Sequence, residues 1–345
     1  MLMIAPLSLP VHGAQMVSSA VLDKIRERSV EPTLIDTNTS ASNLAGSIRE
    51  WMYTLLTGAY DIIRGRSQAS VCYYAPSSGL GFAVELPLLL LARLCGVDSV
   101  YVHHHSFSYL SEEKSLQVTS IKRIFKHRTH ICLCGYMASR VAEFDPSSES
   151  IELSNAAFIK PQSAPTVASE DSDVVNVLFL SNLTEDKGSG RIADTIRDGH
   201  FANNRGFHLD VAGPARDSSA EELLAVIEAE KGTSSVAYHG AVDGEFKADL
   251  LARADFVVLP TSYPVEAQPL VLIEGAAAGA VPVSTSRGCI HSLLDELGGR
   301  YWTDFVDETL VAGVSNPMVG HEDYAAKHGK AVVQLNDVVA SLVAA

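Results

Sequence analysis

The sequence predicts an α/β protein made of two Rossmann-like domains, each with a parallel sheet. Short β-rich runs alternate with longer amphipathic stretches in both halves of the chain, a pattern typical of parallel strands connected by helices. A segment rich in Pro, Ser and Ala, with no apolar period, separates the halves at residues 161–173 and is expected to be a linker. The 345 residues suffice for two domains of roughly 150 residues each.

Residues 1–160 are expected to form the first domain. Its strands are short runs rich in aliphatic, β-branched or aromatic residues, and its helices are longer stretches with an apolar stripe. The expected strands are residues 2–5, 33–36, 70–74, 99–103 and 130–134. The expected helices are residues 14–28, 47–64, 81–95 and 115–125.

Residues 174–323 repeat this pattern and are expected to form the second domain. The expected strands are residues 176–181, 208–212, 236–239, 256–260 and 281–285. The expected helices are residues 189–197, 219–230, 244–252 and 269–279, and residues 324–345 form a C-terminal helix. Two such domains are expected to face each other across a cleft at the carboxyl ends of their strands, where ligands bind in open α/β folds.

The charge of the chain argues against a general nucleic-acid binder. Its 26 basic and 41 acidic residues give a net charge of −15, whereas nucleic-acid binding needs basic surface to displace counterions. Residues 1–160 are neutral in sum, and residues 161–345 carry the whole acidic excess. The first domain is therefore the better candidate to meet an anionic partner or membrane.

Cysteine usage and hydropathy favour a cytoplasmic protein. The five cysteines are an odd number and mostly lie in apolar stretches, where buried thiols are common. The longest apolar run, residues 86–92, is far shorter than the roughly 20 residues of a membrane span, and the N-terminus lacks the basic region of a signal peptide. A basic stretch at residues 121–130 could rest on the inner face of a membrane, although a solvated helix end is the alternative.

The densest chemical signal is the strand–loop–helix segment at residues 259–279. Pro269 is expected at the first helical position, where its missing N–H costs nothing. The free N–H groups of Leu270 and Val271 would then form an anion site. Glu266 precedes the helix, and Glu274 lies roughly 7 Å along its axis from Pro269. A phosphate site flanked by two carboxylates matches the layout of a nucleotide-sugar, with its hexose, diphosphate and ribose.

This segment resembles glycosyltransferase family 4, whose members are retaining enzymes with the GT-B fold. The resemblance rests on the Glu-x7-Glu spacing of Glu266 and Glu274, and the run Tyr-Pro-Val-Glu-Ala-Gln-Pro-Leu is similar to bacterial polysaccharide glycosyltransferases. It implies that Glu266 holds the donor hexose in a catalytic role, that Glu274 holds the ribose, and that Gln268 also binds the donor. Without this context, a solvated Glu266 and a helix-face Glu274 would be the simpler interpretation.

Residues 177–188 resemble the phosphate-binding loop of the same family, which reads Gly-Arg-Leu…Lys-Gly. Lys187 and Gly188 match that pattern, whereas Ser181 replaces the Gly and Asn182 replaces the Arg. Without the Arg, the loop has no bidentate donor for a phosphate group. The donor diphosphate is therefore expected to depend on Lys187 and the helix N-terminus.

Two glycine loops are expected to approach the donor through backbone groups. The resemblance implies that residues 240–242, with Gly240 and Val242, lie near the nucleotide base. It also implies that Gly13, between the first strand and the first helix, lies beside the donor phosphates and the acceptor; a simple strand–helix turn is the alternative.

Three consecutive histidines, residues 103–105, follow the fourth expected strand. Neighbours in an extended chain point to opposite faces, so all three cannot easily bind one ion, and no metal site is expected. The resemblance implies one His near the anomeric carbon of the donor, with His105 as the first choice and His104 as the second. At least one of the three histidines is expected to be structural.

Together these signals predict a retaining GT-B glycosyltransferase that needs no metal or other cofactor. It moves a hexose from a nucleotide diphosphate sugar, linked to UDP or GDP, to a glycan or lipid-linked acceptor held by the first domain. The alternative is a non-catalytic nucleotide-sugar binder or a partner subunit of a transferase, which the replacement by Asn182 keeps open. A GT-B phosphorylase or epimerase is a further alternative. An NAD oxidoreductase is disfavoured because the nearest Gly-rich fingerprint begins several residues after its strand.

Overall fold

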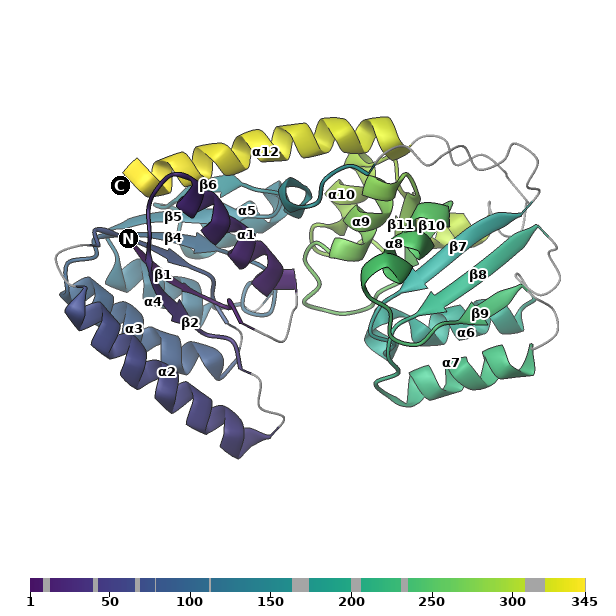
Figure 1. The fold of residues 1–345 in the computed structure, drawn as a ribbon, viewed down its shortest axis with the longest axis horizontal. Coiled ribbons are helices and arrows are strands. Elements are labelled where there is room, and N and C mark those ends of the chain that lie inside the picture. The colour runs from purple at the N-terminus through teal and green to yellow at the C-terminus, as the bar shows by residue number, and fades with distance from the viewer. Residues whose placement is uncertain are drawn as a thin grey trace. The chain divides into compact units, whose positions relative to one another are not determined.

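The chain folds into two units, each built around a six-stranded parallel sheet (Figure 1). Unit 1 comprises Met1–Phe158 and Ala331–Ala345, and unit 2 comprises Ile159–Lys330. The structure is a computed structural model that describes residues 1–8, 13–39, 43–65, 69–77, 79–111, 113–162, 174–199, 206–230, 235–307 and 320–344. Most of the expected linker, residues 163–173, lies outside these described residues.

The sheet of unit 1 has the strand order β2-β1-β3-β4-β5-β6, and every neighbouring pair is parallel. Its strands are β1 (Leu2–Ala5), β2 (Thr33–Asp36), β3 (Val71–Tyr74), β4 (Ser99–His103), β5 (His127–Cys132) and β6 (Glu149–Glu152). Its helices are α1 (Gly13–Glu27), α2 (Leu44–Arg64), α3 (Gly81–Leu94), α4 (Leu116–Ile124) and α5 (Gly135–Phe144), followed by the short 3-10 helix η1 (Asn155–Phe158).

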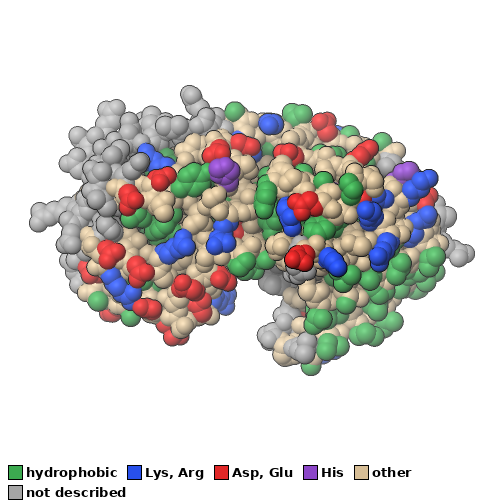
Figure 2. Space-filling view, turned by 180° about the vertical axis from the view of Figure 1, so that it is seen from behind, with side chains coloured by type: hydrophobic (Ala, Val, Ile, Leu, Met, Phe, Trp, Pro, Cys, Tyr) green, Lys and Arg blue, Asp and Glu red, His purple; other side chains and the backbone are tan. Residues whose placement is uncertain are grey.

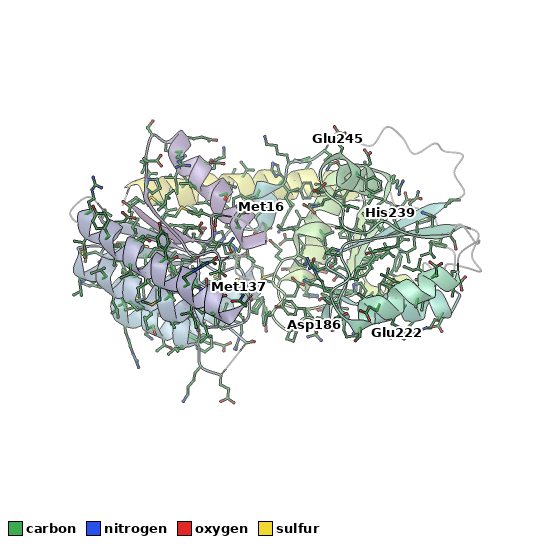
Figure 3. All side chains as sticks on the ribbon, turned by 60° about the horizontal axis from the view of Figure 1, so that its bottom comes forward. Met16, Met137, Asp186, Glu222, His239 and Glu245 are labelled. Carbon is green, nitrogen blue, oxygen red and sulfur yellow. The ribbon has the colours of Figure 1, made fainter. Side chains whose placement is uncertain are left out.

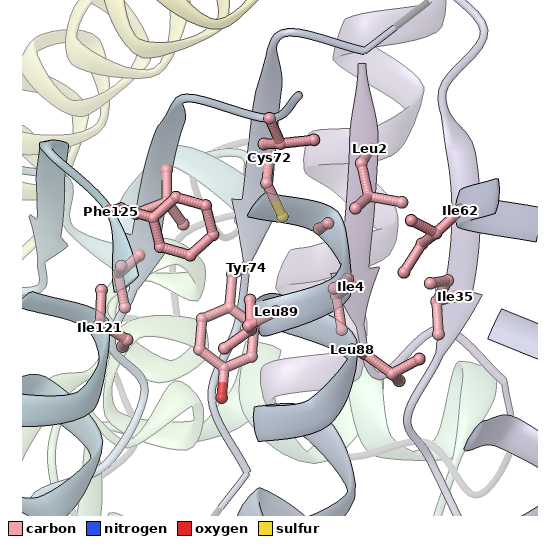
Figure 4. Close-up of a cluster of buried hydrophobic side chains, with 14 residues drawn as sticks. Leu2, Ile4, Ile35, Ile62, Cys72, Tyr74, Leu88, Leu89, Ile121 and Phe125 are labelled. Atoms are coloured by element: carbon pink, nitrogen blue, oxygen red, sulfur yellow. The ribbon is translucent and has the colours of Figure 1, made fainter. Parts of the chain in front are cut away.

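Helices cover both faces of this sheet, as a parallel sheet requires. The helices α2, α3 and α4 pack on one face through a shared cluster of buried side chains (Figure 4). That cluster comprises Leu2, Ile4, Ile35, Ile62, Cys72, Tyr74, Leu88, Leu89, Ala92, Val97, Val100, Val102, Ile121 and Phe125. On the opposite face lie α1 and the end of α12 (Gly320–Ala344) (Figure 1), where Tyr101 of β4 bonds to Ser341.

Unit 2 repeats the architecture with the strand order β12-β11-β10-β7-β8-β9. Its strands are β7 (Val175–Leu180), β8 (Phe207–Ala212), β9 (Val236–Tyr238), β10 (Phe256–Leu259), β11 (Val281–Ser284) and β12 (Arg300–Tyr301). Its helices are α6 (Ser189–Arg197), α7 (Ser218–Ala229), α8 (Gly244–Arg253), α9 (Leu270–Ala278), α10 (Ile290–Glu296) and α11 (Trp302–Asp304), with the 3-10 turn η2 (Glu185–Lys187). Among the described helices, none is both long enough and apolar enough to cross a membrane.

The predicted fold class, with two parallel sheets and a C-terminal helix, is confirmed. The expected strand at residues 130–134 was wrong in its limits, because β5 begins at His127 and ends at Cys132. Cys134 has left the sheet and caps α5, a helix that was not expected. The edge strand β6 was also not expected, since three of its four residues are exposed and it has no apolar alternation.

A glycine turn after β8 brings three loops of unit 2 together. Gly213 follows β8 with a φ of +127°, and a Cβ there would overlap the carbonyl oxygen of Ser181. The N–H of Gly213 donates to the carbonyl of Gly240 at 2.6 Å, so the loops after β7, β8 and β9 meet at this residue. Only glycine fits here, because the backbone conformation and the close approach both exclude a side chain.

We expect Gly213→Ala to destabilise the protein by about 3 kcal/mol or more, because it adds backbone strain and a steric overlap. The matched control is Gly329→Ala in α12, where a Cβ has open space and alanine should add about 0.5–1 kcal/mol of stability. Thermal denaturation of both variants checks this prediction. Equal melting temperatures for the two variants would contradict the described geometry at Gly213.

Candidate active site

The loop between β7 and α6 carries Lys187 to the carboxyl edge of the sheet in unit 2. Thr184 begins the turn, and its Oγ1 accepts a hydrogen bond from the Lys187 N–H at 3.3 Å. Gly188 then adopts a φ of +99°, and a Cβ there would lie 2.6 Å from the carbonyl oxygen of Pro260. The loop can therefore lie against the end of β10 only because residue 188 is glycine.

The loop after β10 also donates hydrogen bonds to the loop between β7 and α6. The backbone carbonyl oxygen of Asp186 accepts hydrogen bonds from the Ser262 N–H at 2.7 Å and from the Thr261 hydroxyl at 2.9 Å. The residue Asp186 is labelled in Figure 3. Thr261 is fully buried. These bonds fix the position of Lys187 relative to the segment that carries Glu266.

Lys187 and Glu266 form an ion pair at this edge. The side chain of Lys187 is 25% exposed and that of Glu266 is 11% exposed, so the pair is reachable but largely shielded from water. The Lys187 ammonium also lies 5.0 Å from the ring centroid of Tyr263, within the range of a cation–π contact. The structure thus brings together two of the residues that the sequence predicted for the donor site.

The helix α9 begins directly after this loop. Pro269 was expected at the first helical position, but it is the N-cap, with an extended backbone at φ −63° and ψ 125°, and the helix starts at Leu270. Leu270 and Val271 lie in the first turn, whose N–H groups have no partner within the helix, and both side chains are half-buried. Gln268, just before the proline, is buried.

Glu274 lies in the second turn of α9 and pairs with a lysine that no sequence motif indicated. Its Oε1 accepts a hydrogen bond from the Lys247 Nζ of α8 at 2.7 Å. The Glu274 side chain is 21% exposed and that of Lys247 is 33% exposed. Each of the two predicted carboxylates of this segment therefore has its own lysine.

The turn after β9 carries Gly240 and Val242, the residues expected near a nucleotide base. Gly240 has a φ of +68°, and no atom lies within 4 Å of the position that a Cβ would take. The preceding residue, His239, stacks edge-on with Phe246 of α8 at 5.4 Å between ring centroids. Val242 is half-buried.

Asp210 of β8 fixes the orientation of His239. Its Oδ1 bonds to the Nε2 of His239 at 2.6 Å and to the Nε2 of His208 at 3.3 Å, and its Oδ2 accepts from Arg253 at 2.8 Å. Burial alone would raise the pKa of Asp210, but the bonds to both histidines and the Arg253 charge outweigh it and lower the pKa to about 2. His239, labelled in Figure 3, is thus held beside the turn by an ionised carboxylate.

The loops after β7 and β8 are joined by backbone hydrogen bonds next to Asn182. Leu183 and Ala215 form an isolated parallel bridge, and the Arg216 N–H donates to the Leu183 carbonyl at 3.1 Å. Both Asn182 and Arg216 are exposed. The sequence signal for Arg216 was its place just after the glycine turn of β8, the position from which loops of a parallel sheet reach ligands.

The histidines of unit 1 have different environments. His103 is fully buried, and its Nδ1 bonds to the Tyr73 hydroxyl at 2.7 Å. His105 is half-buried, and its ring centroid lies 4.2 Å from that of His103. His104 is also fully buried. His105 is therefore the more accessible of the two residues, His105 and His104, that the resemblance assigns to the anomeric centre.

His104 belongs to a buried chain of polar side chains. Its Nδ1 bonds to the Tyr109 hydroxyl at 3.0 Å, and its Nε2 bonds to the Nδ1 of His130 at 2.7 Å. His130 lies 3.7 Å from Asp145, whose carboxylate accepts two bonds from Arg128. Both ring nitrogens of His104 are thus engaged inside unit 1.

Burial determines the charge of His103 and His104. It lowers the pKa of both rings well below the usual value, and neighbouring imidazoles lower it further. Both rings are therefore neutral near pH 7. Within the described ranges, no three His, Cys, Asp or Glu side chains are grouped in a way that could hold a metal ion.

Gly13 is the first residue of α1 and is exposed. The segment that joins it to β1 includes residues 9–12, which lie outside the described part of the chain. The expected approach of this loop to a ligand therefore stays a prediction.

Comparison with known proteins bears directly on unit 2. Residues 175–313 match the family model described as glycosyl transferases group 1. That match covers most of unit 2. The matched segment includes Lys187, Glu266, Glu274 and the whole of α9.

Solved structures extend the likeness to the whole chain. HepE of Anabaena, crystallised with UDP and glucose, aligns with a TM-score of 0.64 at 13% identity, covering 99% of this chain and 98% of its own. The lipopolysaccharide outer core galactosyltransferase WaaB aligns with a TM-score of 0.67 at 12% identity, with 98% of each chain covered. AviGT4, a glycosyltransferase of avilamycin A biosynthesis, aligns with a TM-score of 0.55 at 18% identity, covering 99% of this chain and 97% of its own.

The solved structures identify the fold as GT-B, and the family match over residues 175–313 supports a glycosyltransferase. No curated protein matches the sequence.

We expect the glycosyltransferase to lose stability as the pH falls from about 7.5 to 5.5. Unfolded histidines take up a proton near pH 6.5, whereas His103 and His104 have lowered pKa values and stay neutral in the folded state. Each contributes up to about 1.4 kcal/mol per pH unit well below pH 6.5. Urea unfolding at several pH values measures this slope.

The variant His103→Gln should lower the pH dependence of the unfolding free energy by up to about 1.4 kcal/mol per pH unit, which is the contribution of one histidine. The control is His127→Gln, because His127 is exposed at the start of β5 and its substitution should leave the slope unchanged. A free energy of unfolding that stays constant over this pH range would contradict the neutral state of the buried rings.

Proposed function

We propose that the chain is a retaining hexosyltransferase that uses a nucleotide diphosphate sugar, linked to UDP or GDP, without a bound metal. The observation that carries the proposal is the arrangement at the start of α9, where Lys187 pairs with Glu266 and the first helical N–H groups follow directly. Lys187 and the helix end would stabilise the charge of the leaving diphosphate. HepE, crystallised with UDP and glucose, supports a UDP-linked donor.

The roles of the two carboxylates follow the resemblance. Glu266 would accept hydrogen bonds from the donor hexose, and Glu274 from the ribose. Gly240 and Val242 would lie near the base, and Gln268 would also bind the donor.

Two further residues complete the proposed site. The exposed guanidinium of Arg216 could bind the donor phosphates in place of the arginine that Asn182 replaces. From unit 1, His105 is the residue proposed at the anomeric carbon.

The acceptor would be a glycan or a lipid-linked sugar bound by unit 1. A pocket of about 460 Å³ between β2 and α2 supports this, because Asp36, Asn38, Arg49, Glu50 and Tyr53 contribute polar groups and an aromatic ring to its lining. Carboxylates and amides pair with sugar hydroxyls, and the acidic side chains disfavour an anionic ligand. The basic stretch at residues 121–130, which spans the end of α4 and the start of β5, supports contact with the inner face of a membrane.

A non-catalytic nucleotide-sugar binder is the second candidate, and the exposed Asn182 in place of the arginine favours it. Donor hydrolysis separates the two functions, because a pure binder releases no free nucleoside diphosphate.

We expect Glu274→Ala to weaken nucleoside diphosphate binding about tenfold or more, since the variant cannot accept a hydrogen bond from the ribose. Glu266→Ala should leave nucleotide affinity within about threefold but abolish most use of the intact donor, because no carboxylate then holds the hexose. Calorimetry with UDP and GDP, together with transfer rates, measures both effects. Equal losses for nucleotide and nucleotide-sugar in both variants would show that the two roles are assigned wrongly.

We expect the product to keep the anomeric configuration of the donor. Glu266 would lie on the phosphate side of the hexose, and no carboxylate of unit 1 lies in a sequence motif that suits a base for attack from the opposite face. The leaving phosphate, held by Lys187 and the helix end, would take the proton of the acceptor.

The coupling constant of the anomeric proton, measured by NMR on the product of an α-linked donor, gives the outcome. An α-linked product is expected, also in excess chelator, whereas a β-linked product would require the mechanism to be abandoned.

A further inference from the structure

The outer side of α2 in unit 1 is apolar. Ile48, Met52, Leu56, Tyr60 and Ile63 follow one another at intervals of four and three residues, so they lie on one side of the helix. All five are about half exposed or more, and Leu56 is 65% exposed. A surface helix normally turns polar residues outward, so this helix departs from the usual pattern.

The neighbouring helix α3 continues the same apolar surface. Its exposed positions are Ala83, Pro87, Leu90 and Leu94, and Leu94 is 83% exposed. The inward sides of both helices pack into the shared core of unit 1. The two helices lie next to each other, and Figure 2 shows hydrophobic side chains gathered on this part of unit 1. We call the outward side chains of α2 and α3 the apolar face.

A contiguous apolar surface of this kind needs a partner, whereas single exposed apolar side chains do not. The charges around the apolar face indicate which partner fits. Arg49 and Arg64 are exposed near the two ends of α2. Arg93 of α3 has a side chain that is 40% exposed and pairs with the exposed Asp98 just after the helix. The carboxylates of Glu50 and Asp61 are half-buried and line the pocket toward β2, which Arg49 also lines from the exposed side of α2.

The next helix, α4, adds further positive charge beside α3. Lys122 and Arg123 are exposed in its last turn, and its sequence from Leu116 to Ile124 contains no Asp or Glu. Lys122 donates to the Phe144 carbonyl at the end of α5, so the cations that border the apolar face directly are those of α2.

We propose that the apolar face docks unit 1 on an anionic lipid bilayer. The aliphatic side chains of α2 and α3 enter the boundary between headgroups and acyl chains, and Arg49 and Arg64 bind lipid phosphates. Tyr60 suits the interface, because its ring is apolar and its hydroxyl meets water. A second copy of the chain fits less well, since a two-fold contact would place the same cations against each other.

The role of this docking, which is to bring a lipid-linked acceptor to the enzyme, rests on the proposed function. The docking itself depends on the apolar face and is independent of the donor site in unit 2. Thermal shifts with UDP or GDP, measured without lipid, test the donor site separately, so the two proposals can fail independently.

Vesicle flotation tests the docking with the full chain. We expect the protein to bind vesicles of phosphatidylglycerol and phosphatidylcholine in equal parts far better than vesicles of phosphatidylcholine alone. The double variant Leu56→Glu, Leu94→Glu should lower the partition coefficient about tenfold or more. Arg49→Gln and Arg64→Gln should each lower it about fivefold on the anionic vesicles only.

The matched control is Val333→Glu, which introduces the same charge at an exposed apolar residue of α12 in unit 1. It should leave vesicle binding unchanged. Since all three apolar positions are exposed, melting temperatures should confirm that the variants fold.

Failure of the unmodified chain to bind anionic vesicles would overturn the proposal, as would equal losses in the control. A dimer in lipid-free solution that Leu56→Glu dissociates would identify a second copy as the partner instead.

Discussion

The candidate site depends on the ion pair between Lys187 and Glu266, and that pair depends on a glycine. The two side chains come from loops after neighbouring strands, β7 and β10. The loops can lie against each other because Gly188 has a left-handed backbone and no side chain to meet Pro260. Under the proposed function, a diphosphate would compete with Glu266 for the same ammonium, and Glu266 would then be released to accept sugar hydroxyls.

Most of the fold could be predicted from the sequence because its signals are local. The helix α6 and the strands β1, β2 and β4 have the expected limits, since their apolar runs end at turn residues. The missed elements lack that signal. The edge strand β6 is mostly exposed, and β12 has two residues, so its pairing with β11 is set by tertiary contacts and not by its composition.

The site residues that the sequence predicted also lie in local segments, whereas their partners come from distant parts of the chain. Lys187, Glu266 and Glu274 lie in strand–loop–helix segments, where chain order alone places them at the edge of a parallel sheet. Their partners are distant in sequence, so Lys247 could not be found without the packing of α8 against α9. For His104, the sequence predicted only that neighbouring histidines point to opposite faces, whereas its bond to His130 of the next strand needed the three-dimensional structure.

The helix α12 belongs to both units, and this makes unit 1 discontinuous in sequence. Tyr324 is buried in unit 2, where its hydroxyl bonds to the Ile159 carbonyl, whereas Leu342 of the same helix is buried in unit 1. The chain therefore crosses between the units twice, after Phe158 and within a helix. A fragment that stops at Phe158 would leave one face of its sheet without the end of α12. A fragment that begins at Ile159 would keep every residue of unit 2 but would also carry the end of α12 without its sheet, so a single cut always separates that helix end from unit 1.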